Sequence, residues 1–303
     1  MTATGRARGA HRGRRRGVAM GSGGTRGRGP LTSVDVALAA TLHDPEGALA
    51  GETRRWLPAL RRRYRALAVT TSPATAASMN ALLAAADAYA GTPAADARGP
   101  LYRLAIRGAL ESGAARVHYL DFDRALHWMA TVPRELDALL ARAMDQRTVL
   151  IGRTVRAHRS HHRPLFATET VANRLMGLVL GRAERIDFLV PSFILDPAGA
   201  AGILARSRAR GAAIYGELPA LIAGLDDALA YVECAGLDWE TPDRYRRAVA
   251  RLGMAAWRDR MDTPAEWHTR RIMAREFLRG FVRVAGRSPR PRIRRLRLSS
   301  KRN

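Results

Sequence analysis

At 303 residues and 47% hydrophobic content, the chain is long enough for one large domain or two smaller ones, with ample material for a core. It carries a formal net charge of +24, and its single cysteine, Cys234, excludes an internal disulfide and fits a reducing cytoplasm. No run of 18 apolar residues is present and no apolar segment follows the basic N-terminus, which excludes a membrane-spanning helix and argues against a secretory signal.

The positive charge is concentrated at the two ends of the chain. Residues 1–30 contain eight Arg and no acid, and residues 287–303 contain seven Arg, Lys301 and no acid, which leaves +8 for residues 31–286. Such Arg-rich segments with few large apolar residues are typical of disordered tails. They predict contact with nucleic acid or an anionic membrane surface, while biased base composition with a start at Met20 is the alternative explanation.

In chain order, the first part alternates short apolar runs, typical of buried strands, with amphipathic stretches, typical of helices. The expected strands are Val34–Leu42, Leu67–Thr71 and the apolar run that starts at Arg116. The expected helices are Glu52–Tyr64, Ser72 to about Ala90, and Pro100–Ser112.

The second part continues the alternation. The expected strands are Thr148–Gly152, Asp187–Leu195 and Tyr231–Cys234, and Arg153–Pro164 is a basic, His-rich loop. The expected helices are Pro133–Ala143, Thr168–Leu180, Pro197–Ala209, Asp243–Arg260 and Glu266–Val284. The alternation predicts an α/β fold: a single Rossmann-like mixed sheet with helices on both faces over residues 31–240, a helical extension over 241–286, and disordered basic tails at 1–30 and 287–303.

The pattern most suggestive of chemistry is a D-x-D at the end of the strand that starts at Arg116. Because strand side chains alternate, Asp121 and Asp123 are expected to point the same way. Two such carboxylates can hold Mg²⁺, which keeps water or phosphate as its other ligands. The alternative is a solvated strand end in which Asp123 caps the next segment.

Other polar clusters also fall at strand ends. His43-Asp44 and Gly152-Arg153 follow strands, and ligands of α/β sheets bind at their carboxyl edge. Arg103 and Arg107 share a helix face and predict phosphate binding, unless they only form a salt-bridged face with Glu111.

Two further candidates depend on loops. His158, His161 and His162 lie in the basic loop, which predicts a mobile phosphate-binding lid or a plain solvated loop. Glu217 is a candidate general base for an acceptor hydroxyl, unless it is a helix-start acid. Rival carboxylates for the base are Asp187, Asp196, Asp226 and Asp227.

The order of these parts resembles the nucleotide-diphospho-sugar transferases of GT-A fold, near glycosyltransferase family 2 and the polyprenol-phosphate mannosyltransferase type. The residues that carry the likeness are Leu42–Gly47, the stretch Ala105-Ile106-Arg107-Gly108, the D-x-D, Gly152-Arg153, and Asn173 on a helix. The resemblance implies that Asp121 and Asp123 hold Mg²⁺ or Mn²⁺. It also implies that a nucleoside-diphosphate sugar contacts His43, Asp44, Arg103, Arg107, Asp121 and Arg153.

The expected activity is therefore a metal-dependent, inverting hexosyltransferase with Glu217 and Asp123 as catalytic residues and a lipid phosphate, saccharide or protein as acceptor. Its expected location is the cytoplasm or the inner face of the membrane. The alternatives are a nucleic-acid-binding protein that uses the basic tails, and an inactive, partner-binding relative.

Overall fold

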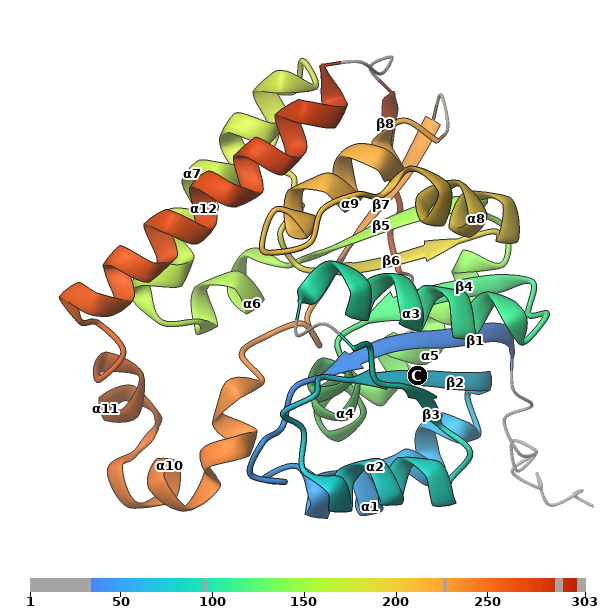
Figure 1. Ribbon diagram of the computed structural model, residues 1–303. Coiled ribbons are helices and arrows are strands. Elements are labelled where there is room, and N and C mark those ends of the chain that lie inside the picture. Colours follow the sequence, from blue (N-terminus) through green and yellow to red (C-terminus); the bar gives the residue numbers. More distant parts are fainter. Residues whose placement is uncertain (1–33, 95–96, 226–227, 287–290, 299–303) are drawn as a thin grey trace, which may run out of the picture. The chain divides into compact units, whose positions relative to one another are not determined.

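Short apolar runs and amphipathic helices alternate along the chain. The computed structural model describes residues 34–94, 97–225, 228–286 and 291–298. In it the helices pack around a mixed sheet (Figure 1). The strands are β1 (Val34–Leu42), β2 (Tyr64–Thr71), β3 (Tyr89–Gly91), β4 (Arg116–Leu120), β5 (Thr148–Arg153), β6 (Ser192–Leu195), β7 (Ala228–Cys234) and β8 (Arg292–Arg295). The helices are α1 (Ala50–Arg61), α2 (Ala77–Ala85), α3 (Arg98–Glu111), α4 (Phe122–Thr131), α5 (Pro133–Ala143), α6 (Val155–Ser160), α7 (Arg163–Val179), α8 (Pro197–Arg206), α9 (Ile214–Ala223), α10 (Arg246–Leu252), α11 (Met254–Asp259) and α12 (Pro264–Ala285), with a 3₁₀ helix, η1 (Thr241–Tyr245), before α10.

The strand order places several strand ends on one edge. In the described part the order is β3-β2-β1-β4-β6-β5-β7-β8, and β6 runs antiparallel to both β4 and β5. The pairs β1–β2 and β1–β4 are parallel, so that Leu42 lies beside Thr71 and β4 finishes at the same edge. The carboxyl ends of these three strands therefore border a common space, the usual position of a ligand in such sheets.

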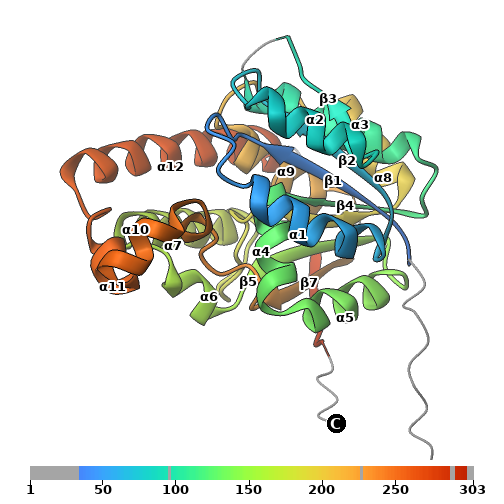
Figure 2. The same cartoon turned by 90° about the horizontal axis from the view of Figure 1, so that it is seen from below.

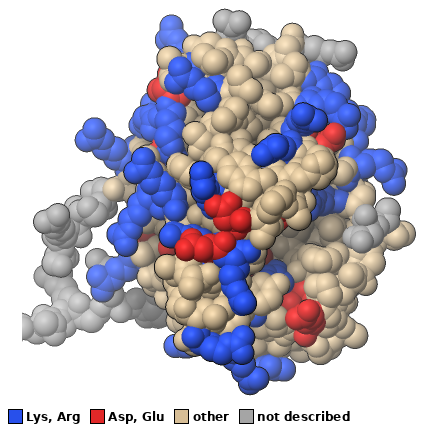
Figure 3. All heavy atoms as spheres, turned by 90° about the vertical axis from the view of Figure 1, so that its left-hand side faces the viewer, with Lys and Arg blue, Asp and Glu red and all other residues tan. Residues whose placement is uncertain are grey.

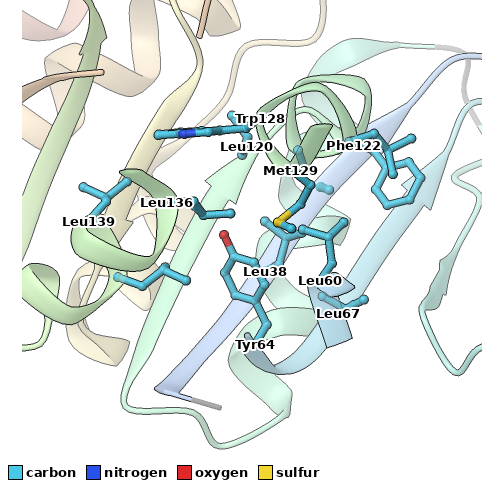
Figure 4. Close-up of a cluster of buried hydrophobic side chains, with 14 of the residues drawn as sticks. Leu38, Leu60, Tyr64, Leu67, Leu120, Phe122, Trp128, Met129, Leu136 and Leu139 are labelled. Atoms are coloured by element: carbon cyan, nitrogen blue, oxygen red, sulfur yellow. The ribbon is translucent and has the colours of Figure 1, made fainter. Parts of the chain in front are cut away.

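Both faces of the sheet are buried under helices. Along β1, Val36, Leu38 and Ala40 contact the cluster that includes α1, α2, α4 and α5. Ala37 and Ala39 contact the opposite cluster, which includes α3, α8 and α9. Strands buried on both faces read as continuous apolar runs, which is why this strand was predicted with its observed bounds. Figure 4 shows the first cluster, with side chains from β1, β2, α4 and α5 packed together.

Helix α12 docks on the domain rather than projecting from it. It lies alongside α7 and against α9 (Figures 1 and 2). A Cβ atom on Gly216 of α9 would lie 1.8 Å from the carbonyl oxygen of Phe277, and one on Gly280 of α12 would lie 2.1 Å from that of Ala213. Glycine at these positions lets the two helix backbones touch.

Several elements differ from the prediction. The helix expected over 243–260 is divided at Gly253, whose φ of +79° breaks the helix into α10 and α11. The strand expected over 187–195 forms only at Ser192–Leu195. Helices α4, α6 and α9 were not predicted; α6 lies in the basic stretch expected to be a loop, and α9 contains Gly216 and Pro219, which favour turns.

The prediction of a disordered tail over 287–303 was wrong for part of that range. Residues Arg292–Arg295 form β8, which pairs in parallel with β7 at the edge of the sheet. Leu296 is buried in the cluster on one face of the sheet and Ile293 packs against the cluster on the other, so apolar contacts on both faces anchor the segment despite its arginines. The predicted tail at 1–30 lies outside the described residues. Within the described ranges, every helix is too short or too polar to span a membrane.

Candidate active site at the carboxyl edge of the sheet

A cavity of about 440 Å³ opens at the carboxyl ends of β1, β2 and β4. We call it the donor cavity; its lining residues are Thr41, Leu42, His43, Ser72, Arg98, Leu101, Tyr102, Asp121, Asp123, Tyr215 and Arg244. Figure 3 views the side of the molecule toward which β1 runs, and there acidic side chains gather near the middle of a face rich in arginine. The cavity thus combines two carboxylates with cationic side chains, which suits a charged ligand.

Asp121 occupies the N-cap position of α4, directly after β4. Its Oδ1 accepts hydrogen bonds from the hydroxyls of Thr41 (2.9 Å), Tyr119 (3.0 Å) and Tyr102 (3.5 Å). Burial, followed by the nearby charge of Asp123, raises the pKa of Asp121 to about 6. Because three hydroxyls fix one oxygen, the carboxylate has a defined orientation in the cavity wall.

Asp123 lies in the first turn of α4, not on a strand. Its Oδ1 accepts from the backbone N–H of Arg124 (2.9 Å), and its Oδ2 accepts from Nη2 of Arg244 (2.9 Å). The argument from strand alternation was therefore wrong, since the chain becomes helical after Leu120. Both carboxylates nevertheless line the same cavity, because one sits at the helix N-cap and the other in the helix's first turn.

Arg244 of η1 was missed by the sequence analysis, and it joins three parts of the site. In addition to Asp123, it donates through Nη1 to the carbonyl oxygen of His43 (2.9 Å) and to Oδ1 of Asp44 (3.2 Å). Its partners are 121 to 201 residues away in the chain, so no local pattern could reveal them. The only local signal was an arginine next to Asp243 in an acid-rich stretch.

The structure separates the two residues of the His43-Asp44 pair. His43 lines the donor cavity, and its Nδ1 is 2.8 Å from Oγ of Ser72. Asp44 is buried, and its two carboxylate oxygens accept from the backbone N–H groups of Ala48 and Leu49. Asp44 therefore orders the turn before α1 and holds Arg244, and it does not line the donor cavity.

The two arginines predicted on α3 lie elsewhere. Arg103 donates to the carbonyl oxygen of Ala209 (2.9 Å) and to Oγ of Ser207 (3.3 Å), so it joins α3 to the segment after α8. Arg107 is exposed outside the donor cavity. Neither of the two predicted arginines lines the donor cavity, and the arginine of α3 that does is Arg98, at the start of the helix.

Arg153 was also expected to bind diphosphate, but it is 1% exposed and fully engaged inside the protein. It donates to Asp187 through Nε (2.7 Å) and Nη2 (3.0 Å), and to Glu169 through Nη2 (2.5 Å). Asn173 completes this buried network by donating to Asp187 (2.8 Å). The structure thus places Arg153 in a buried network that ties β5 to α7 and not in the donor cavity, because its partners come from segments distant in the sequence.

The expected basic lid is likewise a packed structure. Residues 155–160 form α6, and His158, His161 and His162 are 2–3% exposed. Thr154 caps α6 by accepting from the backbone N–H of Ala157 (3.1 Å). The histidines are therefore held in place rather than solvated.

Glu217 does not reach the donor cavity. It is 1% exposed on α9, accepts from Ser207 (2.7 Å) and the backbone N–H of Ala209 (3.0 Å), and forms an ion pair with Arg283 of α12 (2.6 Å). These contacts join α9, the segment after α8, and α12 through Glu217, so the structure places the candidate base away from the donor cavity. Of the rival bases, Asp187 is buried in the Arg153 network, Asp196 caps α8, and Asp226 and Asp227 lie outside the described residues.

Comparison with known proteins identifies the fold. No protein-family model matches the chain, and the curated proteins contain no match. Glucosyl-3-phosphoglycerate synthase from Mycobacterium tuberculosis superimposes with a TM-score of 0.53 at 13% identity, covering 83% of this chain and 80% of that chain.

Two complexes of the same enzyme give similar matches. The complex with UDP has a TM-score of 0.49 at 12% identity and covers 83% of this chain and 80% of that one. The complex with Mn²⁺, UDP and phosphoglyceric acid has a TM-score of 0.48 at 16% identity and covers 76% and 79%. At these identities the likeness concerns the fold, and the α/β fold of GT-A type predicted from the sequence is confirmed.

Proposed function

We propose that the chain is a glycosyltransferase that binds a nucleoside-diphosphate sugar in the donor cavity with the help of a divalent cation. The observation that carries this proposal is the convergence of Asp121 and Asp123 with Arg98 and Arg244 on one open cavity of about 440 Å³. The fold supports it, since a protein of the same fold is named glucosyl-3-phosphoglycerate synthase. The mannosyltransferase type and the cytoplasmic location remain predictions.

The carboxylates fit a small hard cation. In the described ranges, no group of three or more His, Cys, Asp or Glu side chains is arranged to enclose a metal by itself. Two carboxylates therefore favour an ion that takes its remaining ligands from water and phosphate, as Mg²⁺ does and as the sequence predicted for Mg²⁺ or Mn²⁺. When bound, such an ion would neutralise charge on the diphosphate.

The cationic side chains would bind the departing diphosphate. Arg244 and Arg98 line the cavity beside the two carboxylates, and guanidinium groups match phosphate oxygens with paired hydrogen bonds. Positioned positive charge stabilises a leaving group in which negative charge develops. Arg244 is oriented by Asp44 and Asp123, and it would contact the diphosphate by exchanging its bond to Asp123, whose oxygen would then be free for the cation.

A binding experiment tests the proposal. Wild-type protein should bind UDP-glucose or GDP-mannose in calorimetry with MnCl₂ or MgCl₂, and EDTA should weaken binding. The double variant Asp121→Ala/Asp123→Ala should lose roughly 100-fold or more in affinity, because each charged contact contributes about 1.5–3 kcal/mol. Asp145→Ala, which changes an acid whose side chain is 70% exposed on the surface, is the control and should bind normally. Cation-independent binding, or equal affinity of the double variant, would refute the proposal.

A further inference from the structure

A second open cavity, of about 470 Å³, lies between α12 and the segment that joins α8 to α9. We call it the arginine cavity, because Arg208 and Arg210 line it from that segment and Arg279 and Arg283 line it from α12. These four arginines are not among the residues that line the donor cavity. The two cavities have similar volumes, so the second one also has room for a small molecule.

Small residues keep the space between these arginines open. Apart from Glu276, the other lining residues are Ala209, Gly211, Ala213 and Gly280, whose side chains have one carbon atom or none. Ala213 and Gly280 belong to the close contact of α9 with α12, in which a Cβ atom on Gly280 would lie 2.1 Å from the carbonyl oxygen of Ala213. Because these two backbones are packed together, the cavity has a fixed shape.

A buried carboxylate, that of Glu217, joins the two sides of the arginine cavity. Its Oε1 accepts hydrogen bonds from the backbone N–H of Arg208 (2.9 Å) and from Nη2 of Arg283 (2.6 Å). Its Oε2 accepts from the hydroxyl of Ser207 (2.7 Å), and the side chain is 1% exposed. One buried group therefore fixes the backbone on one side and an arginine on the other, which sets the separation of the two sides before any ligand binds.

Positive charge in the arginine cavity exceeds the negative charge around it. Four arginines line it with a single acid, Glu276, and Glu217 supplies one further negative charge from below the surface. In the described part of the chain, neither Arg208 nor Arg210 has a carboxylate within ion-pair distance, and both are exposed. Burial lowers the pKa of Arg103 on α3, and the charges of Arg208 and Arg210 lower it further, against the attraction of Glu217. Like charges are thus gathered here without enough acids to balance them, an arrangement that an anion would stabilise.

We propose that the arginine cavity is a second ligand site, which binds a phosphate-bearing anion: either a free phosphorylated compound or the headgroup of an anionic phospholipid. Guanidinium groups match phosphate oxygens with paired hydrogen bonds, and a phosphate brings more negative charge than a carboxylate does. Arg208 and Arg210 are the residues free to make these bonds. Arg279, whose side chain is 72% exposed, faces the same cavity from α12 and is paired only with Glu276 at the surface. This site is separate from the donor cavity and does not depend on the proposed function.

Calorimetry with sodium pyrophosphate tests the site for a free phosphate compound. EDTA is present, so that no divalent cation draws the probe into the donor cavity. Arg208→Gln/Arg210→Gln should bind roughly 10-fold or more weakly than wild type, because two exposed charged contacts are lost. Arg279→Gln, on the opposite side, should also weaken binding, and added NaCl should weaken binding to wild type because the arginines are exposed.

Sedimentation with vesicles of phosphatidylglycerol and phosphatidylcholine tests the site for a lipid headgroup. Pyrophosphate affinity that falls in Arg208→Gln/Arg210→Gln would identify a free phosphate compound as the ligand. Vesicle binding that falls in this variant, without pyrophosphate binding to wild type, would identify the headgroup. The variant should bind UDP-glucose as wild type does, so its effect is distinct from a failure of the proposed function.

Arg61→Gln/Arg62→Gln is the matched control, because it removes the same charge from exposed residues at the end of α1 and should bind both probes as wild type does. The inference is overturned if neither probe distinguishes Arg208→Gln/Arg210→Gln from wild type, or if the control loses as much affinity as that variant. It is also overturned if Arg98→Gln, which changes the donor cavity, abolishes pyrophosphate binding while Arg208→Gln/Arg210→Gln retains it.

Discussion

His127 of α4 holds the segment 238–243, which directly precedes Arg244 of the donor cavity, and its contacts predict that stability depends on pH. The imidazole is 10% exposed and lies between two carboxylates, with Nε2 2.8 Å from Oδ1 of Asp238 and Nδ1 2.7 Å from Oδ2 of Asp243. These two acids flank Glu240, and Arg244 follows directly. A charged His127 can donate to both acids at once.

The size of the stabilisation by His127 follows from the pKa of its imidazole. Burial opposes protonation, but the hydrogen bonds and charges of Asp238 and Asp243 prevail and raise the pKa of His127 from 6.5 to about 9. That difference corresponds to about 3 kcal/mol of folding free energy. Because the side chain of Asp238 is 42% exposed, water screens part of its attraction, and we expect about 2 kcal/mol.

Because the pKa of His127 is higher in the folded state than in the unfolded state, its contribution to stability decreases as the pH rises. The stabilisation is fully present below pH 6.5 and is lost as the pH rises through about 9. Urea denaturation of wild type and His127→Gln at pH 6, 8 and 10 measures it. Their difference in unfolding free energy should shrink by about 2 kcal/mol over this range.

The control is His268→Gln, which changes an exposed histidine of α12 and should give no pH-dependent difference from wild type. A difference between wild type and His127→Gln that is the same at pH 6 and pH 10 would show that His127 is not held as a cation. The clamp between α4 and the 238–243 segment would then depend only on neutral hydrogen bonds.

Two further predictions concern stability. Burial alone would raise the pKa of Asp187, but Arg153 holds it well below its usual value, so Asp187→Asn should cost about 3–5 kcal/mol at neutral pH in urea denaturation. This contribution should fade as the pH falls below about 4, and a variant that is equally destabilised at pH 3 would contradict it. Gly280→Ala should lower the unfolding free energy by several kcal/mol, since its Cβ would meet the carbonyl oxygen of Ala213 at 2.1 Å. Gly51→Ala, whose Cβ would have no neighbour within 4 Å, is its control, and equal stability of the two variants would argue against close contact of α9 and α12.

The elements that could be predicted are those whose signals are local. The strand Val34–Leu42 and the helix Pro133–Ala143 have the predicted bounds. The first is an apolar run ended by polar loop residues, and the second begins with proline at the first helical position. Both signals lie inside the element itself, so tertiary contacts did not need to be known.

The segment from Arg153 to Pro164 could not be predicted for the opposite reason. Its charge suggested a solvated loop, but the acids that neutralise Arg153 lie 16 and 34 residues farther along the chain. A cluster of positive charge is stable inside a protein only when its partners are brought to it by the fold. Local composition therefore gave the wrong environment for both the arginine and the histidines.

The candidate site was predictable only where its residues follow a strand directly. Asp121 and His43 line the donor cavity because parallel strands end at one edge, which their positions after apolar runs already implied. Arg98 and Tyr215 line it through helices that pack above this edge, and nothing in their neighbourhoods marks them. The sequence thus predicted the edge at which the donor cavity opens, with an incomplete set of side chains.

The predicted boundary between the sheet domain and the helical extension, at residue 240, falls inside the segment 238–246, which contributes to the candidate site. Glu240 on one side of that boundary forms an ion pair with Arg124 of α4 (3.1 Å), and Arg244 on the other side lines the donor cavity. His127 fixes the segment to α4, the helix whose first turn carries Asp123. Asp123 and Arg244 of the donor cavity are therefore positioned through the same short segment, so a change that loosens it should disturb that cavity.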